Sequence, residues 1–307
     1  MDIRHFKIPV NCYLASETKT SDKVQDFCKE YLDNGVLILP ENYTDDGKPT
    51  RLVITCHGAG GTVTTDDAQI IPKPLTKYLV ANGYAVMDVN GLPEEYAKLQ
   101  GIDVRNNIGS PIAIRSYVKA YFYCVNNFNL QREVFVHGAS LGGISSTNLV
   151  LSGQIPVIAH SAFCPVLDTF NEIFTHPWSD GLPKYAMGKI YGFDKDENGE
   201  YLYDESKLAG FNPVKNAKAN YYPVPVKFWH CKDDPIVRYT ITEQFIKTLK
   251  TNGCTAYLRP FDYGGHEPQT VGNVVENPYG IHFFEGEKLQ IKPAVEEFFI
   301  WIKNFDY

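Results

Sequence analysis

Long apolar runs are missing from this chain of 307 residues. No stretch of about 18 consecutive apolar residues occurs, so we expect no membrane-spanning helix and no membrane partner. The amino terminus also lacks a charged segment followed by an apolar one, the pattern of a secretory leader. The sequence therefore predicts a cytoplasmic protein, or a secreted one if a leader has been removed.

An excess of basic residues is missing too. Lys and Arg together number 29 and Asp and Glu 36, which gives a formal net charge of -7. Such a mildly acidic chain is poorly suited to binding nucleic acid, so we expect no nucleic-acid partner. Internal repeats and low-complexity segments are also absent. With 44% apolar residues, the whole of 1–307 is expected to form one domain with a large core.

Cysteine is scarce, and its spacing matches neither a disulfide-bonded fold nor a metal site. The seven cysteines are an odd number, and none recurs at the spacing of a disulfide framework or a metal site. Cys56, Cys124 and Cys231 lie in or beside apolar runs, where free thiols behave as small buried hydrophobes. The sequence therefore predicts buried free thiols.

Four histidines lie near the ends of expected strands: His57, His137, His160 and His230. A metal cluster would need cysteine or carboxylate partners at ligand spacing, and none recurs there. We therefore expect no metal and favour hydrogen-bonding roles beneath the site, above all for His230.

Short apolar runs alternate with amphipathic segments along most of the chain. Strands are expected at 36–39, 51–56, 84–89, 133–137, 157–160, 224–230 and 256–259, and helices at 75–83, 111–126, 241–251 and 292–305. Strands that alternate with helices favour an α/β fold with a mostly parallel central sheet and helices on both faces. The alternation breaks at about 165–222, which predicts a cap inserted over the sheet.

The turn at residues 138–142, which reads Gly-Ala-Ser-Leu-Gly, is the most informative part of the chain. It follows an apolar run and precedes the start of a helix. Such a turn places its serine in a strained conformation at the carboxyl end of the strand. The flanking glycines avoid collisions with the neighbouring strand and helix. Ser140 is therefore a candidate nucleophile, and the alternative is a serine with a purely structural role.

A serine hydroxyl needs a base to take its proton, and the base needs an acid to orient it. His266 follows Gly264 and Gly265, whose conformational freedom can turn the imidazole back toward the serine. Asp234 lies just beyond the strand that ends near residue 230 and is the favoured acid. Asp233 is the competitor, and we expect it to cap or solvate the loop. For His266 the alternative is an ordinary loop histidine.

A glycine-rich turn at 57–61 follows the strand at 51–56. Such a turn can direct backbone N–H groups at a developing oxyanion. Ala59 is the favoured donor, with Gly60 as the alternative. Leu141 is the second expected donor, because it begins the helix after Ser140 and the helix dipole favours negative charge there.

The motifs at 57–61, 138–142, 234–237 and 264–266 together resemble the motif series of the α/β-hydrolase superfamily. They are most similar to serine esterases of the dienelactone-hydrolase and prolyl-oligopeptidase-like branch. The resemblance runs from about residue 35 to the carboxyl terminus, without the insertion. It implies an α/β-hydrolase fold, a triad of Ser140, Asp234 and His266, oxyanion donors at Ala59 and Leu141, and neither metal nor organic cofactor.

We therefore expect a serine hydrolase that cleaves a carboxylic ester through an acyl-enzyme. The insertion at 165–222 and the loop at about 267–287 are expected to wall the pocket. Aromatic side chains there could stack on a sugar, which favours a small-molecule or glycan ester with an acetyl or feruloyl group. The candidate substrate contacts are His57, Gly60, Asp66 and Trp178.

Three alternatives to the esterase remain. A serine peptidase of the prolyl-oligopeptidase-like type would use the same groups, although it is expected to need a gating domain for which 307 residues leave little room. An acyltransferase would pass the acyl group to an alcohol instead of water. A non-catalytic binding module would lack a member of the triad, and all three are present.

The run 194–205 carries the residues of a calcium-binding loop in the right order. Leu202, however, occupies a position where an oxygen ligand or its water usually belongs, and no clear pair of helices flanks the run. We favour the alternative, a β-hairpin in which Asn198 and Gly199 form a type I′ turn before a strand at 201–203.

Overall fold

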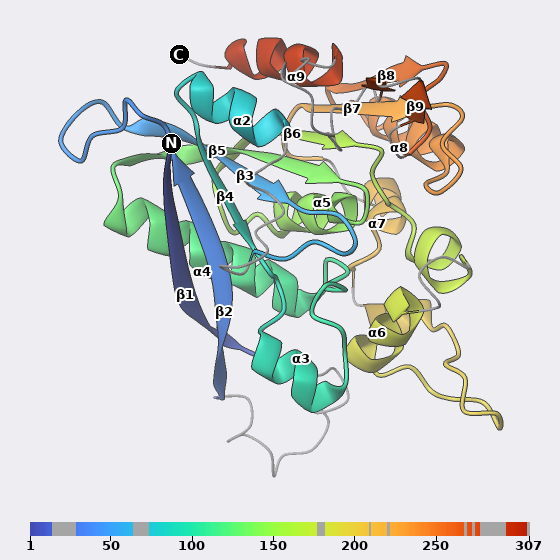
Figure 1. The fold of residues 1–307 in the computed structure, drawn as a ribbon. Coiled ribbons are helices and arrows are strands. Elements are labelled where there is room, and N and C mark those ends of the chain that lie inside the picture. Colours follow the sequence, from blue (N-terminus) through green and yellow to red (C-terminus); the bar gives the residue numbers. More distant parts are fainter. Residues whose placement is uncertain are drawn as a thin grey trace.

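A computed structural model describes residues 1–13, 29–63, 74–176, 182–208, 210–219, 222–266, 269–271, 274–276 and 293–305. Its main sheet has eight strands in the order β1-β2-β4-β3-β5-β6-β7-β8 (Figure 1). Strands β3 to β8 pair in parallel, and β1 and β2 are antiparallel to their neighbours. The predicted mostly parallel α/β sheet is therefore confirmed.

The strands of this sheet are β1 (Asp2–Asn11), β2 (Glu30–Leu39), β3 (Thr50–Cys56), β4 (Ala85–Val89), β5 (Leu130–Ala139), β6 (Val157–Phe163), β7 (Val226–Cys231) and β8 (Ala256–Phe261). The α-helices are α2 (Pro74–Ala81), α3 (Glu94–Gln100), α4 (Pro111–Asn127), α5 (Gly142–Ser152), α6 (Leu182–Tyr191), α7 (Pro213–Ala219), α8 (Tyr239–Thr251) and α9 (Pro293–Lys303). A separate hairpin pairs β9 (Gln269–Val271) with β10 (Val274–Glu276).

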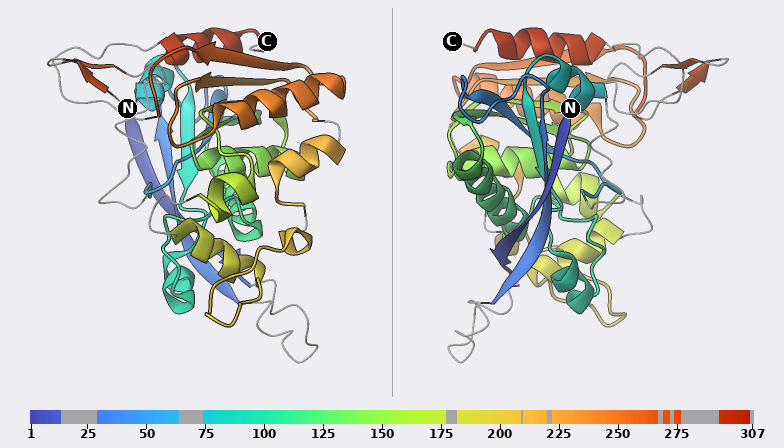
Figure 2. Two further views of the ribbon diagram at one scale, coloured as in Figure 1. Left: turned by 90° about the vertical axis from the view of Figure 1, so that its right-hand side faces the viewer. Right: turned by 60° about the vertical axis from the view of Figure 1, so that its left-hand side comes forward.

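The sheet divides the apolar core into two, because successive strand residues point to opposite faces. On β3, for example, Val53 belongs to one core cluster, and Leu52 and Ile54 belong to the other. Helices α2 and α9 cover the first face, and α4, α5 and α8 contribute to the second (Figure 2). The expected helices on both faces are confirmed.

The hairpin of β1 and β2 is the largest element that the sequence analysis did not predict, since only residues 36–39 of β2 were expected to form a strand. Its two strands pair over their full length, from Asp2 opposite Leu39 to Asn11 opposite Glu30. The side chain of Phe6 lies so close to β2 that a Cβ atom on Gly35 would be 2.3 Å from its ring. Gly35 is therefore an interior position of β2 at which a larger residue would require the Phe6 ring to move.

Between β6 and β7, where the cap is predicted, the described chain forms four short helices. They are a π-helical turn (Thr169–Phe174), α6, a 3₁₀ turn (Glu205–Leu208) and α7. The ammonium group of Lys189 on α6 donates a hydrogen bond to the carbonyl of Gln100 at the end of α3. This contact places α6 beside α3 (Figure 1).

The hairpin predicted for the run at 194–205 is present. Lys195 pairs with Tyr201, and the N–H of Asp196 donates to Glu200 O at 2.9 Å. Gly199 has φ 83°, whereas Asn198 does not have a positive φ, so the predicted type I′ turn is wrong. The loop is one residue longer because the Asp196 carboxylate accepts the N–H groups of Asn198 and Glu200, each at 2.9 Å.

The six cysteines within the described ranges are buried and form no disulfide with one another, as predicted: Cys12, Cys56, Cys124, Cys164, Cys231 and Cys254. Among the helices of the described chain, none combines the length and the apolar character needed to cross a bilayer.

Candidate active site

Ser140 lies in the sharp turn between β5 and α5, with φ 52°. A positive φ costs a residue with a side chain about 1–2 kcal/mol, so neighbouring contacts must hold it. Its N–H donates to Phe163 O at 3.0 Å, and its carbonyl accepts the N–H groups of Gly143 and Val166, each at 2.9 Å. The predicted strained serine is confirmed.

The two flanking glycines are required by close packing. A Cβ atom on Gly142 would lie 1.9 Å from Cys56 O on β3, and one on Gly138 would lie 2.2 Å from Ser146 Oγ on α5. Both distances are far shorter than any real contact. The turn therefore depends on glycine at both positions, for the reason that the sequence suggested.

Three side chains from separate strand ends meet at this turn. Nε2 of His266, which follows β8, lies 3.0 Å from Ser140 Oγ. Nδ1 of the same ring lies 2.8 Å from Oδ2 of Asp234, which follows β7. The Asp234 carboxylate has no exposed surface, and His266 is 8% exposed. The three residues that the sequence singled out are thus hydrogen-bonded in series.

Asp234 is held as a carboxylate by four hydrogen-bond donors. Oδ1 accepts the N–H groups of Ile236 and Val237, each at 2.9 Å, while Oδ2 faces His266 at 2.8 Å and His230 Nε2 at 3.2 Å. Burial acts to raise the pKa of Asp234, but the hydrogen bonds from His230 and His266 outweigh burial and hold it below its usual value. The group is therefore ionised at neutral pH.

His230 supports Asp234 from beneath, as the sequence suggested. Its Nε2 faces two acceptors, Asp234 Oδ2 and Val237 O at 3.1 Å, so this atom carries a hydrogen. Its Nδ1 lies 2.9 Å from Thr242 Oγ1 on α8. The hydrogen-bonded series therefore extends from Thr242 through His230 to Asp234.

Asp233 holds the histidine loop instead of the imidazole. Its two carboxylate oxygens accept the N–H groups of Gly264, at 3.2 Å, and Gly265, at 2.9 Å. These two residues immediately precede His266. These contacts agree with the expectation that Asp234 faces the imidazole and Asp233 caps a loop. The loop that Asp233 caps is the one that carries His266.

The pKa of His266 is raised above its ordinary value. Burial acts to lower it, whereas Cys164 and the Asp234 carboxylate act to raise it. A contribution from Cys164 requires a thiolate, and burial raises the pKa of that thiol. The negative charge that stabilises the protonated imidazole is therefore that of Asp234.

The glycine-rich turn after β3 lies against Ser140. The N–H of Gly61 donates to Gly58 O at 3.2 Å and Gly60 has φ 76°, so Ala59 and Gly60 are the central residues of a β-turn. A Cβ atom on Gly58 would lie 3.3 Å from Ser140 Cβ. Within the described chain, the N–H groups of Ala59, Gly60 and Leu141 have no acceptor. Backbone donors on both sides of the serine are thus available to a ligand.

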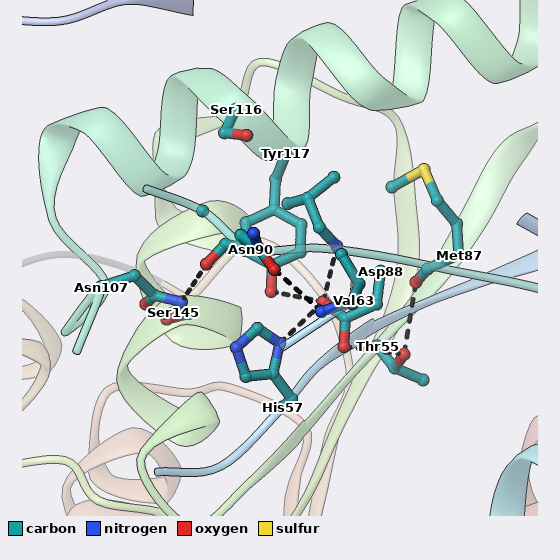
Figure 3. Close-up of polar contacts among 12 residues, drawn as sticks. Thr55, His57, Val63, Met87, Asp88, Asn90, Asn107, Ser116, Tyr117 and Ser145 are labelled. Carbon is teal, nitrogen blue, oxygen red and sulfur yellow. Dashed lines mark hydrogen bonds and ion pairs between the residues drawn. The ribbon is translucent and has the colours of Figure 1, made fainter. Parts of the chain in front are cut away.

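The expected substrate contacts have different outcomes. The imidazole of His57 is buried, with Nδ1 3.2 Å from Asp88 Oδ1 (Figure 3), so it lies beneath the glycine-rich turn and is not exposed for a substrate contact. Gly60 lies on the partly exposed turn. Asp66, Trp178 and most of the loop at 267–287 lie outside the described residues.

The cap aromatics mostly pack against one another. Tyr191 is 2% exposed, and the Tyr203 ring lies 5.2 Å from Phe174 and 5.5 Å from Phe193. Tyr185 is 41% exposed and could meet a ligand. Within the described part of the cap, Tyr191 and Tyr203 therefore offer little ring surface to a sugar, whereas Tyr185 and Phe170 remain exposed.

Two residues near the triad gave no signal in the sequence. Cys164 follows β6, and its sulfur lies with ligand atoms of Asp234 and His266 within 4.8 Å of one another. The hydrogen bond between Asp234 and His266 accounts for this proximity without an ion. Glu172 accepts the N–H groups of Leu167 at 2.7 Å and Arg238 at 3.2 Å, and burial raises its pKa to about 7.

No protein-family model matches the sequence, and no curated protein is similar to it. Solved structures, by contrast, are similar in fold. An acylaminoacyl peptidase from Pyrococcus horikoshii gives a TM-score of 0.62 at 16% identity, covering 86% of this chain and 38% of its own. A puromycin-hydrolyzing peptidase from Mycobacterium tuberculosis gives 0.58 at 18% identity, covering 76% and 34%. Dipeptidyl peptidase 4 from Porphyromonas gingivalis gives 0.57 at 14% identity, covering 85% and 32%.

These likenesses and the sheet topology identify the fold as that of the α/β hydrolases. The chain spans only 32–38% of the length of these three similar structures. All three are named as peptidases, and a serine peptidase was one of the alternatives to the predicted esterase.

Proposed function

We propose that this protein is a serine hydrolase that transfers an acyl group to water through a covalent acyl-enzyme. The observation that carries the proposal is the position of His266, with Nε2 3.0 Å from Ser140 Oγ and Nδ1 2.8 Å from Asp234 Oδ2. A hydroxyl on a strained turn, a base within reach and an ionised acid behind the base meet the requirements for serine nucleophilic catalysis. The three side chains come from the ends of three different strands, which supports a site and not a chance contact.

In this mechanism Ser140 attacks the substrate carbonyl while His266 takes its proton. Asp234 keeps the imidazole in the tautomer with hydrogen on Nδ1 and stabilises the imidazolium that forms. The N–H groups of Ala59 and Leu141 receive the oxyanion, each contributing on the order of 3 kcal/mol to transition-state stabilisation. His266 then protonates the leaving group, and water activated by the same ring releases the acid.

The substrate class that we propose is a peptide or amide. Peptidases recur among the similar structures. The packed interior of the cap also weakens the argument for a glycan ester, because Tyr191 and Tyr203 are engaged with other aromatic rings. The carboxylic ester remains the second candidate, because an acyl-enzyme can form from either bond and Tyr185 remains exposed.

Labelling with a fluorophosphonate tests the nucleophile. We expect stoichiometric labelling of the wild type and none of Ser140→Ala. The matched control is Ser152→Ala, which removes a hydroxyl at the end of α5 that donates to Leu149 O and accepts the N–H of Gln154. Equal labelling of the Ser140→Ala protein would contradict the proposal.

A matched pair of substrates tests the bond. The N-acetylalanine p-nitroanilide and p-nitrophenyl ester share one acyl group and differ only in the leaving group. Turnover of the anilide that disappears in Ser140→Ala supports a peptidase. Ester turnover without measurable anilide turnover supports the esterase.

A further inference from the structure

A fully buried carboxylate lies beneath the oxyanion turn. Asp88 on β4 has no exposed surface and accepts hydrogen bonds from the Tyr117 hydroxyl at 2.8 Å and the Val89 N–H at 2.8 Å. His57 Nδ1 lies 3.2 Å from the same oxygen. Burying a carboxylate is costly unless hydrogen-bond donors surround it, so the loss of any of these donors would destabilise the fold around Asp88. His57 therefore donates from Nδ1, and its ring is fixed immediately before the turn.

A second contact fixes the far end of the same loop. Asn90 Oδ1 accepts the N–H of Val63 at 2.8 Å. Asn90 lies just beyond the end of β4, two positions after Asp88, and both side chains contact the loop at 57–63 (Figure 3). The loop at 57–63 is thus clamped at its first residue by Asp88 and at its last by Asn90 (Figure 3).

The clamp continues to the helix that carries the other donor. The side-chain amide of Asn107 donates to Asn90 O at 2.9 Å, and the hydroxyl of Ser145 donates to Asn107 Oδ1 at 2.9 Å. Ser145 lies in the first turn of α5, and this helix begins directly after Leu141. A continuous series of buried polar contacts therefore joins the loop of Ala59 to the helix that begins after Leu141 (Figure 3).

We propose that Asp88 and Asn90 are positioning residues that set the separation of the two oxyanion donors. This inference rests on the proposed function. An oxyanion is stabilised only by donors about 2.7–3.1 Å from it, so small displacements of the turn weaken the transition state. The three glycines at 58, 60 and 61 give the turn conformational freedom of its own, and the clamps remove that freedom.

Asp33 supplies a matched control. It is equally buried, on β2, and accepts the N–H groups of Asn34 at 3.0 Å and Gly91 at 2.9 Å together with the Ser116 hydroxyl. None of these donors belongs to the loop at 57–63. Asp33→Asn therefore removes a buried carboxylate from the same core without removing a hydrogen bond of the loop at 57–63, and its interaction with that loop is electrostatic, with His57.

The kinetic test compares Asp88→Asn, Asn90→Ala and Asp33→Asn with p-nitrophenyl acetate as substrate. For the first two we expect kcat to fall about tenfold to a hundredfold, because a backbone donor is displaced but not removed. KM should be nearly unchanged, because the oxyanion forms only in the transition state. The inhibition constant of a trifluoromethyl ketone, which forms an oxyanion on the serine, should rise by the same factor. Asp33→Asn should keep the kcat of the wild type. A fall in kcat for Asp33→Asn as large as for Asp88→Asn, or a loss confined to KM, would overturn the proposal.

Hydrogen exchange tests the clamp without relying on activity. In Asp88→Asn and Asn90→Ala, the peptide that contains residues 57–63 should exchange faster than in the wild type, and in Asp33→Asn it should not. Unchanged protection in Asp88→Asn and Asn90→Ala would refute the clamp even in an active enzyme. The two proposals can also be separated. If Asp88→Asn and Asn90→Ala show faster exchange but the wild type is not labelled by a fluorophosphonate, the clamp is supported and the proposed function is refuted.

Discussion

Replacing Asp234 with asparagine should stop hydrolysis by reversing one hydrogen bond. Oδ1 accepts the N–H groups of Ile236 and Val237, so the oxygen of the new amide must stay at that position. The amide nitrogen then takes the place of Oδ2, 2.8 Å from His266 Nδ1, where it can only donate. His266 must therefore offer a bare Nδ1, and its hydrogen moves to Nε2, the atom that faces Ser140.

An imidazole with hydrogen on Nε2 cannot accept the proton of Ser140. We expect kcat to fall by about 10⁴-fold, the usual effect of the wrong tautomer, which equals roughly 5.4 kcal/mol of transition-state stabilisation. KM should change little, because the Asp234 carboxylate has no exposed surface with which to contact a substrate. The assay is steady-state hydrolysis of p-nitrophenyl acetate, with Ser140→Ala defining the background.

The neighbouring Asp233→Asn is the matched control. It weakens one of two backbone contacts of the histidine loop, at Gly264 or Gly265, and leaves the imidazole partners in place. Loss of one such hydrogen bond costs about 1 kcal/mol, so kcat/KM should fall by less than about tenfold. Asp234→Asn retaining more than about a tenth of wild-type kcat, or Asp233→Asn being the more damaging change, would refute this reasoning.

Three further predictions concern pH, packing and calcium. Because only the neutral imidazole accepts a proton and the pKa of His266 is raised, kcat/KM should fall with decreasing pH along a limb centred above pH 6.5, and a limb centred below that value would contradict this assignment. Gly142→Ala should destabilise the fold by at least about 3 kcal/mol in urea, since its Cβ would lie 1.9 Å from Cys56 O, whereas Gly153→Ala, with φ 62° and no atom within 4 Å, should cost only about 1–2 kcal/mol. Millimolar calcium should leave the thermal midpoint unchanged, because Asp196 already accepts the N–H groups of Asn198 and Glu200, and a clear rise would show that the run at 194–205 binds the ion.

The parts of the site that the sequence predicted are those encoded within a few residues. The strained φ of Ser140 and the close packing of Gly138 and Gly142 follow from one turn between a strand and a helix. The series of Ser140, Asp234 and His266 could be assembled because the carboxyl ends of parallel strands meet at one edge of the sheet. Residue chemistry and local geometry were therefore sufficient to predict this turn and the three residues that meet at it.

The parts that the sequence did not predict depend on contacts between distant segments. Asp88 and His57 are 31 positions apart, and nothing local to Asp88 indicates that it will be buried beneath a turn. The long pairing of β1 with β2 likewise depends on tertiary contacts, such as that of Phe6 with Tyr123 on α4, whose ring centroids are 4.7 Å apart. For the run at 194–205 the predicted hairpin was correct but its turn type was wrong. The Asp196 carboxylate accepts two backbone N–H groups and so stabilises a loop that is one residue longer.

Glu172 couples the cap to the proposed catalytic acid. Its carboxylate accepts the N–H groups of Leu167 and Asp168 in the first turn of the cap, and the N–H of Arg238 in the acid loop. Arg238 directly follows Val237, whose N–H is bound by Asp234 Oδ1 at 2.9 Å.

One buried carboxyl group, whose pKa is raised by burial to about 7, therefore contacts both the start of the cap and the acid loop. Protonation of Glu172 would weaken its hold on all three N–H groups at once, because a neutral carboxyl is a poorer acceptor than a carboxylate. Since the same loop holds Asp234, we expect a change at Glu172 to affect the hydrogen bond between Asp234 and His266. Substitutions at Glu172 should consequently alter kcat, whereas changes to side chains that only line the pocket should alter KM.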